Sequence, residues 1–462
     1  MDEKEREFEE SLEKVMELLL EKKYFRARDE LLKFNEADIA EMFEEILDDN
    51  DIQMAVILFR LLPKDTSVLV FSYLPSNDQL DIINEITDKE ISYIVRELDF
   101  DDKIDVLEEL PANIVDKILE KTPKNERKQI NTFLNYPEHS AGSLMTLSYI
   151  SLMKDWTVSE ALDYIRKEGP DAETIYTCYV KDTGRKLIGI VSLATLVVSD
   201  KGTKIKDVMI TDYVYEHVDD DQEDVSEDFK KYGYLAIPVV DKEHRLVGII
   251  TFDDILDVME DEATEDIERM NGVIDFDDSD RDYLDTPVIR HAMNRLPWLV
   301  ILMVAYIFTG GIIKNFESSL SKVIELVAFM PMLMGTGGNS GSQAATLIIR
   351  GLATDEVDTD DAFKILWKEF RVGIIIGGLL SILNYLRIYF IDGIHNPGIA
   401  LTVCVSMIFI VIFAKIIGSM IPILVKKINL DPALIANPAI SSVSDAVALS
   451  IYFAMASIFL NL

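Results

Sequence analysis

Cysteine is the scarcest informative residue in this sequence: its 462 residues include only Cys178 and Cys404. Two cysteines exclude a disulfide framework and a thiolate metal site. A signal peptide is missing as well, because the charged segment from Met1 to Lys14 has no apolar core. We therefore expect the N-terminal part of the chain to stay in the cytosol.

Basic residues are also in short supply, with 45 Lys and Arg against 82 Asp and Glu, for a net charge of −37. The imbalance is uneven: from Leu296 onward there are 11 acidic and 10 basic residues, which leaves 71 and 35 before it. Such an acidic surface repels phosphate and argues against a nucleic-acid partner. Most of these carboxylates suit a solvated surface, and others suit divalent cations that would draw neighbouring domains together.

Catalytic motifs are absent too. The glycine-rich stretch Gly335–Gln343 lacks the Lys-Ser/Thr pair of a phosphate-binding loop, and no nucleophile is paired with a base at a recognisable spacing. We therefore expect a protein that is not an enzyme.

Long apolar runs are present only in the C-terminal half, and each is long enough for the roughly 20 residues that cross a bilayer. They are Leu296–Phe316, Ile324–Ile349, Val372–Ile391, Gly398–Val425 and Ala433–Leu460. Of the basic residues at the ends of these runs, eight fall on one predicted side of the membrane and three on the other. The eight are Arg290, Arg295, Arg350, Lys364, Lys368, Arg371, Lys426 and Lys427. The bias predicts a cytoplasmic N-terminus and, with five spans, a C-terminus outside the cell.

Two polar features interrupt these runs. Glycine and amide residues of Gly335–Gln343 are tolerated in lipid mainly where they face other helices or a watery passage. Asp445 stands in the last span, where an ionisable group is costly and indicates a functional site. Asn437, Ser441 and Asp445 are four residues apart, about 40° per step around a helix, and form one polar line.

Each of these residues has a plainer interpretation. Asn437 and Ser441 suit hydrogen bonds between helices almost as well as a pore lining, and Asp445 would also suit a pair with Lys415 or a protonated acid. Pro438 is expected to bend the last span. Gly373 and Gly377 favour ordinary close packing of helices.

The N-terminal half begins with helical periodicity over residues 1–130, broken at Leu62-Pro63, Leu74-Pro75 and Leu110-Pro111, which predicts a superhelical stack. A repeat follows: Leu187–Ser192 reappears as Leu246–Thr251, each copy preceded by a second strand, Ile175–Lys181 or Leu235–Asp241, and flanked by helical patterns. This duplicated β-α-β unit resembles a tandem pair of cystathionine-β-synthase-type (CBS) domains.

The second repeat ends in Gly248-x-x-Thr251-x-x-Asp254, which is similar to a nucleotide-ribose pattern of CBS domains and raises ATP as a ligand. The first repeat departs from it, and the pattern equally suits a helix N-terminus stabilised by acid. A long acidic helix follows, Asp253 to Met270, with Glu262, Glu265 and Asp266 on one face. Their mutual repulsion favours a bound cation over a plain solvated linker.

The order of these parts resembles the MgtE family of magnesium channels and transporters over essentially the whole chain. The motifs that carry the resemblance are Tyr136–Thr146, Glu262–Ile267, Gly335–Arg350 and Asp431-Pro432-Ala433 running to Asp445. One departure is Ser342, where the family usually has Asn. The expected domains are a helical domain (1–130), two CBS domains (131–200 and 201–260), a connecting plug helix (261–290) and a five-span α-helical pore domain (291–462).

The resemblance implies a homodimer in the plasma membrane whose pore is lined by spans two and five, with Asp445 selecting the ion. It also implies a cytoplasmic gate in which Glu262, Glu265 and Asp266 meet Asp431 across a bound Mg²⁺. The remaining residues that we expect to line the pore or to hold regulatory cations are Asn437, Ser441, Gly338 and Asn339 for the pore, and Asp254, Asp257, Asp101 and Asp105 for cations.

The predicted function is a Mg²⁺-selective channel that intracellular Mg²⁺ closes. Mg²⁺ keeps several waters and takes one or two carboxylates, so one Asp per subunit suits a hydrated ion. Mn²⁺ and Co²⁺ share its octahedral habit and are not excluded. Two alternatives remain: a carrier coupled to protons or sodium, and a membrane-bound CBS sensor that does not conduct.

Overall fold

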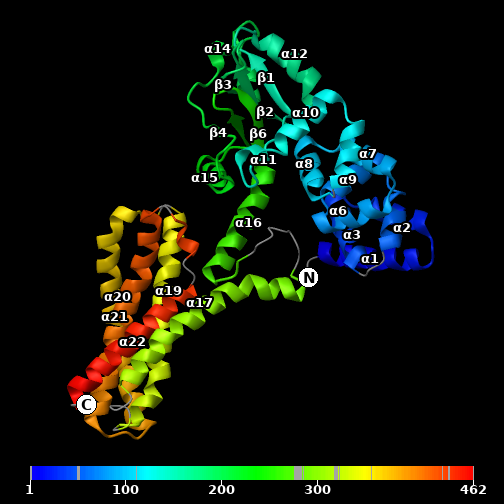
Figure 1. The fold of residues 1–462 in the computed structure, drawn as a ribbon. Helices are drawn as coiled ribbons and strands as arrows, with labels where there is room; N and C mark the ends of the chain where they lie inside the picture. The colour runs from blue at the N-terminus through cyan, green and yellow to red at the C-terminus, as the bar shows by residue number, and fades with distance from the viewer. Residues whose placement is uncertain are drawn as a thin grey trace. The chain divides into compact units, whose positions relative to one another are not determined.

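The computed structural model describes residues 3–48, 52–110, 112–274, 283–284, 286–316, 321, 323–354, 356–428, 430–434 and 437–460. They form two compact units, Met1–Asp261 and Glu262–Leu462, which are taken here one at a time (Figure 1).

The first unit begins with a stack of short helices. They are α1 (Glu3–Leu20), α2 (Tyr24–Leu31), α3 (Glu36–Asp48), α4 (Ile52–Phe59), α5 (Lys64–Ser72), α6 (Ser76–Glu85), α7 (Asp88–Glu97), α8 (Phe100–Glu109), α9 (Ala112–Lys121) and α10 (Lys124–Phe133). Pro63 and Pro75 are the residues just before α5 and α6, so these two Leu-Pro breaks are confirmed. Proline suits a helix start because its missing N–H would have no partner there. Pro111 lies outside the described residues.

The repeat folds as two similar three-stranded sheets after the short helix α11 (Ala141–Leu144). The first contains β1 (Tyr149–Met153), β2 (Thr174–Lys181) and β3 (Leu187–Ser192), and the second β4 (Glu216–His217), β5 (Ala236–Val240) and β6 (Leu246–Thr251). In each, the first strand pairs parallel and the last antiparallel to the middle strand. The strands predicted from the repeat are confirmed, and β1 and β4 are additional.

Helices complete each copy of the repeat. The first copy has α12 (Val158–Glu168), the 3₁₀ turn η1 (Gly169–Asp171), α13 (Leu193–Val198) and α14 (Ile205–Val208), and the second has α15 (Gln222–Tyr232) and α16 (Phe252–Met270).

One hydrophobic core extends from Phe43 and Phe71 of the helical stack to Phe229 and Ile237 of the second copy. The helical stack and this copy are therefore packed as one body. Burying such apolar surface stabilises it by about 25 cal/mol per Å².

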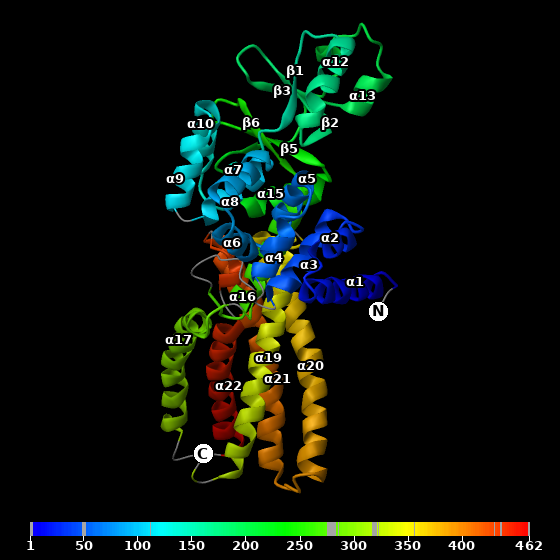
Figure 2. The same cartoon turned by 90° about the vertical axis from the view of Figure 1, so that its right-hand side faces the viewer.

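In the described residues of the second unit there are five long helices: α17 (Val288–Asn315), α19 (Glu325–Ala353), α20 (Ala362–Phe390), α21 (Pro397–Lys427) and α22 (Asn437–Leu460). The 3₁₀ turns η2 (Thr359–Asp361) and η3 (Pro432–Leu434) lie between them. Figure 2 shows the long helices side by side as a bundle. Among the described residues, four of these helices are long and apolar enough to cross a membrane, and α19 is not one of the four. Its polar stretch Gly335–Gln343 lowers its hydropathy.

Small residues set the spacing of this bundle. A methyl group added at Gly373 or Gly377 would lie 2.9 or 3.0 Å from a backbone atom of α21, Cα of Ile412 or Ile408. Gly373 and Gly377 therefore allow α20 to pack closely against α21, which is the interpretation that their spacing favoured.

Pro438, where a bend was expected, is the second residue of α22, and the turn η3 ends at Leu434. Residues 435 and 436 lie outside the described part of the chain, so the bend stays a prediction.

Candidate functional site

The helices α19 and α22 approach each other closely at Gly338. A methyl group added to Gly338 would lie 3.4 Å from Asp445 Oδ1 and would overlap Ser441 Oγ. One turn along α19, a methyl group at Gly341 would lie 2.8 Å from Ser444 Oγ. Glycine is therefore required here because the polar face of α22 lies directly against the backbone of α19. Gly338, Ser441 and Asp445, three predicted pore residues, lie together.

Asp445 is buried, with 8% of its surface exposed. Among the described residues, no hydrogen bond or ion pair includes its carboxylate. Lys415, which was weighed as its partner, instead lies 3.8 Å from Glu369 Oε2, with both side chains mostly buried. A buried carboxylate without a protein partner is costly, and it suits a passing or bound cation.

The other expected pore residues have mixed surroundings. Asn437 Oδ1 and Ser444 Oγ are buried with no hydrogen-bond partner in the described part of the chain. Ser342 Oγ donates to the carbonyl of Asn437 at 3.5 Å, so the family departure at Ser342 makes a contact between α19 and α22. Asn339 is exposed.

A second polar group lies where the end of α16 meets the turn before α22. Arg269 Nη1 lies 3.4 Å from Asp431 Oδ2, and the same guanidinium pairs with Glu265. Burial raises the pKa of Asp266, and the nearby carboxylate of Asp431 raises it further, with Arg269 acting in the opposite direction. Glu262 adds a smaller upward effect. The four acids predicted for the gate are thus neighbours.

Arg269 is the residue of this group that the sequence analysis missed. Its charge lies where a bound cation was expected, between Glu265 and Asp431. The signal was available, because Arg269 stands four residues after Glu265 on the same helix and such pairs contact one another.

Carboxylates also meet inside the first unit, between the helical stack and the second copy of the repeat. Burial raises the pKa of Asp102 to about 6, and the charges of Asp99, Asp254 and Asp253 contribute. Thr251 Oγ1 donates a hydrogen bond of 2.6 Å to Asp254 Oδ2. Asp254 is therefore part of an acidic junction, and Asp102 is a member that the sequence analysis overlooked.

The remaining predicted cation ligands are less informative. Asp105 and Asp257 are exposed. The side chain of Asp101 lies outside the described residues. Across the described ranges, no three His, Cys, Asp or Glu side chains are arranged to hold a metal ion.

One buried acid has no counterpart in the sequence-based predictions. Glu216 of β4 is 7% exposed, and its Oε1 has no hydrogen-bond partner among the described residues. Burial raises the pKa of Glu216 to about 8, and the carboxylates of Asp228 and Asp220 raise it further. No pattern in the sequence marks it, because the two-residue strand β4 is too short to show alternation.

Family models match three parts of the chain. A model described as the MgtE intracellular N domain matches residues 34–139, the CBS domain model matches residues 141–200 and 205–261, and a model described as a divalent cation transporter, MgtE, matches residues 330–455.

Curated relatives match nearly the whole chain. Magnesium transporter MgtE of Thermus thermophilus is 36% identical over 94% of this chain and 95% of its own length. Its namesake in Bacillus subtilis is 32% identical over 91% of this chain and 94% of its own length.

Among solved structures, the soluble part of a magnesium transporter has a TM-score of 0.50 at 29% identity, covering 55% of this chain and 99% of that one. The cytosolic domain of the Mg²⁺ channel MgtE in complex with ATP has a TM-score of 0.48 at 33% identity, covering 52% and 96%. The motifs, the domain order and the full-length relatives agree: this chain belongs to the MgtE family of divalent cation transporters, which are not enzymes.

Proposed function

We propose that this protein is a Mg²⁺-selective channel that mediates magnesium uptake as a homodimer and is closed by intracellular Mg²⁺. One observation carries the proposal: the buried carboxylate of Asp445 has no partner among the described residues and lies against Gly338, where α19 has no side chain. Two full-length relatives named as magnesium transporters support the choice of ion.

The chemistry of the crossing suits a hydrated ion. Mg²⁺ gives up its water reluctantly, so it is held by one or two carboxylates together with water. A second copy of the chain would bring a second Asp445 to the same axis. The hydroxyl of Ser441 and the free oxygens of Asn437 and Ser444 would then accept hydrogen bonds from the ion's waters, as neutral groups do without trapping the ion. Exposed Asn339 faces away from the core of one protomer and so suits a position where two protomers meet.

Closure by Mg²⁺ follows from charge. Arg269 pairs with Glu265 and Asp431, and Asp266 is influenced by Asp431, Arg269 and Glu262. Asp102 is likewise influenced by Asp99, Asp253 and Asp254. Divalent cations at such junctions would relieve the repulsion and favour the compact, closed state. An ion can shift this equilibrium only if it binds the closed state more tightly.

The membrane arrangement is part of the proposal. We count α19 as the fifth span, since its polar stretch packs against neighbouring helices and needs no lipid-facing apolar surface. The excess of basic residues on one side then puts the N-terminus in the cytoplasm and the C-terminus outside, in the plasma membrane.

Uptake in magnesium-starved cells tests this function. Asp445→Ala should abolish growth at low Mg²⁺ and radiotracer or dye-reported uptake, while Asp360→Asn, which neutralises an exposed acid of the same unit, should leave both unchanged. Equal uptake by Asp445→Ala and the unaltered chain would favour the non-conducting sensor.

A channel and a coupled carrier differ in the driving force that moves the ion, and this difference can be measured. Reconstituted channels should pass Mg²⁺ current that follows the magnesium gradient and the voltage alone. Current that vanishes when the proton or sodium gradient is removed would favour the carrier, and equal currents of Mn²⁺ or Co²⁺ would argue against selectivity for Mg²⁺.

ATP at the CBS pair is a separate proposal. Thr251 and Asp254 bond each other, so a nucleotide ribose would have to compete with that hydrogen bond. ATP titrated against the purified protein should bind, and Asp254→Asn should weaken that binding if the pattern Gly248-x-x-Thr251-x-x-Asp254 forms the site. Unaltered affinity would assign Asp254 to helix capping alone.

A further inference from the structure

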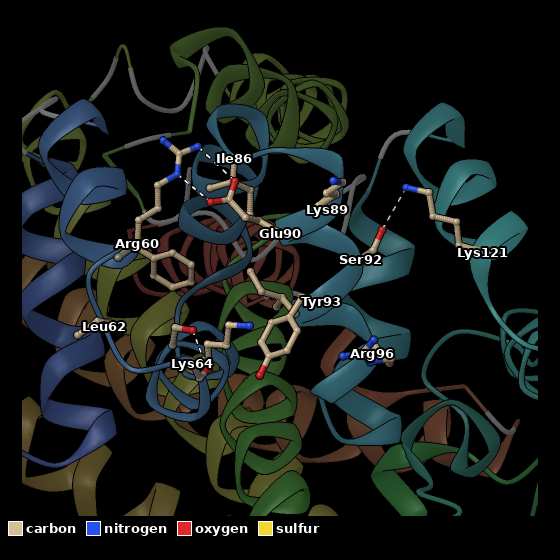
Figure 3. Close-up of a pocket in the computed structure, with 13 residues that line it drawn as sticks. Arg60, Leu62, Lys64, Ile86, Lys89, Glu90, Ser92, Tyr93, Arg96 and Lys121 are labelled. Atoms are coloured by element: carbon tan, nitrogen blue, oxygen red, sulfur yellow. Dashed lines mark hydrogen bonds and ion pairs between the residues drawn. The ribbon is translucent and has the colours of Figure 1, made fainter.

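The helical stack of the first unit contains a basic pocket in an otherwise acidic half of the chain. Its volume is about 640 Å³, within the range of small-molecule sites. It is lined by the end of α4, the start of α5, the residue that ends α6, part of α7 and the end of α9 (Figure 3). Five of its lining residues are Lys or Arg, namely Arg60, Lys64, Lys89, Arg96 and Lys121, and one is acidic, Glu90.

Glu90, the one acidic side chain that lines the pocket, already has hydrogen-bond and ion-pair partners. Glu90 accepts from Arg60 Nε at 3.0 Å, and Glu90 also receives the backbone N–H of Thr87 at the start of α7. Figure 3 shows the Arg60–Glu90 pair at one side of the pocket. Glu90 is thus held by Arg60 and by the helix it caps, and it does not neutralise the lysines across the pocket.

Three lysines that line the pocket are available to pair with an anionic ligand. In the described part of the chain, no carboxylate pairs with Lys64, Lys89 or Lys121. Lys121 Nζ donates to the hydroxyl of Ser92 at 3.4 Å, which is a neutral group. Lys64 Nζ lies 4.7 Å from the ring centre of Tyr93, a contact that fixes an ammonium without cancelling its charge.

The floor of the pocket is apolar. Phe59, Leu62, Ile86 and Ile94 line it and are each at most 8% exposed. Tyr93 projects from α7, with Lys64 beside its ring (Figure 3). A bare inorganic anion would leave the apolar floor in water, whereas an apolar group alone would leave three ammonium groups without a counter-charge.

We propose that this pocket binds a small organic phosphate that carries a flat apolar group, with the phosphate among Lys64, Lys89 and Lys121 and the apolar group on the floor. A phosphate dianion matches several cations better than a single carboxylate does, because it carries up to two negative charges and three strong acceptor oxygens. The site lies within the helical stack and is separate from the CBS pair and from the acidic junctions.

Calorimetry on the full-length protein in lipid nanodiscs tests the proposal, with phenyl phosphate as the probe and EDTA present to remove divalent cations. Phenyl phosphate should bind more tightly than inorganic phosphate, and benzyl alcohol should not bind. Lys64→Gln and Lys89→Gln should each weaken binding by roughly tenfold. Added salt should weaken it further, because the lysines are exposed.

Lys124→Gln is the matched control, since it removes one exposed lysine of the same stack outside the pocket. It should leave the affinity unchanged. An unchanged elution volume in size-exclusion chromatography separates loss of a contact from loss of fold. Phenyl phosphate that fails to bind, or that binds equally to the Lys64→Gln, Lys89→Gln and unaltered chains, would overturn the proposal, and neither result depends on magnesium transport.

Discussion

Arg269 Nη1 lies 3.4 Å from Asp431 Oδ2, and Arg269 also pairs with Glu265 one turn earlier on α16. The connecting helix is therefore tied to the start of the last span by an internal cation. Since both side chains are more than a third exposed, the pair itself contributes at most about 1 kcal/mol. A divalent ion can compete with a contact of that strength.

We predict that Arg269→Gln weakens closure at low Mg²⁺. Without the guanidinium, Glu265, Asp266 and Asp431 repel each other until a divalent ion arrives, so the basal current in magnesium-free buffer should rise. Millimolar internal Mg²⁺ should still close the channel. Patch-clamp recording at zero and at saturating internal Mg²⁺ measures both, and a basal current equal to that of the unaltered chain would count against a role for Arg269.

Gly338→Ala should reduce transport strongly. The added methyl group would overlap Ser441 Oγ and approach Asp445 Oδ1, so α19 and α22 must separate or rotate. Gly335→Ala is the matched control on the same helix, because a methyl group at Gly335 meets nothing within 4 Å. The comparison is uptake per amount of protein in the membrane, and equal uptake by the two variants would show that the crossing tolerates a side chain.

The ion pair between Lys415 and Glu369 should behave as a buried pair. Removing one partner of such a pair typically costs about 3–5 kcal/mol, because the other charge is left buried and alone. Lys415→Met should therefore lower the unfolding temperature in detergent more than the double change Lys415→Met with Glu369→Gln does. If the two variants unfold at the same temperature, the pairing of Lys415 with Glu369 does not contribute to stability.

Glu216 should make stability depend on pH. Its pKa is raised from 4.5 to about 8, so between these values the folded chain holds a proton that the unfolded chain has released. Stability therefore falls as pH rises from 4.5 to 8, and below this range the two states bind the proton equally.

Glu216→Gln removes the ionisable group, so the variant should unfold at a higher temperature than the unaltered chain at pH 8.5, by roughly 2–4 °C for each kcal/mol gained. The gap should narrow toward pH 5. Glu243→Gln, at an exposed turn, should show no such trend. A gap that is the same at both pH values would contradict the assigned titration.

The sequence predicted most of the secondary structure because its signals are local. The duplicated Leu187–Ser192 and Leu246–Thr251 segments are strands β3 and β6, and the acidic helix from Asp253 is α16. The close approach of Gly373 and Gly377 to α21 also followed from the spacing of small residues. Periodicity and glycine spacing act within one element or one helix pair, so they can be interpreted without a fold.

Contacts between distant segments were less predictable. The turn η3 at Pro432–Leu434 was not expected, because the apolar run from Ala433 to Leu460 shows no interruption there. Asp102 and Glu216 acquire their character from burial beside other acids, which no pattern of their own neighbours reveals. The choice of Glu369 as the partner of Lys415 likewise depends on how α20 and α21 pack.

The carboxylate of Asp445 is the group on which the proposed conduction depends, and single-channel recording tests it most directly. In bilayers that contain the purified protein, the unaltered chain should pass inward Mg²⁺ current, and Asp445→Asn, which keeps the size of the side chain and removes its charge, should pass none at the same voltage. Unchanged Mg²⁺ current and selectivity through Asp445→Asn would contradict the account.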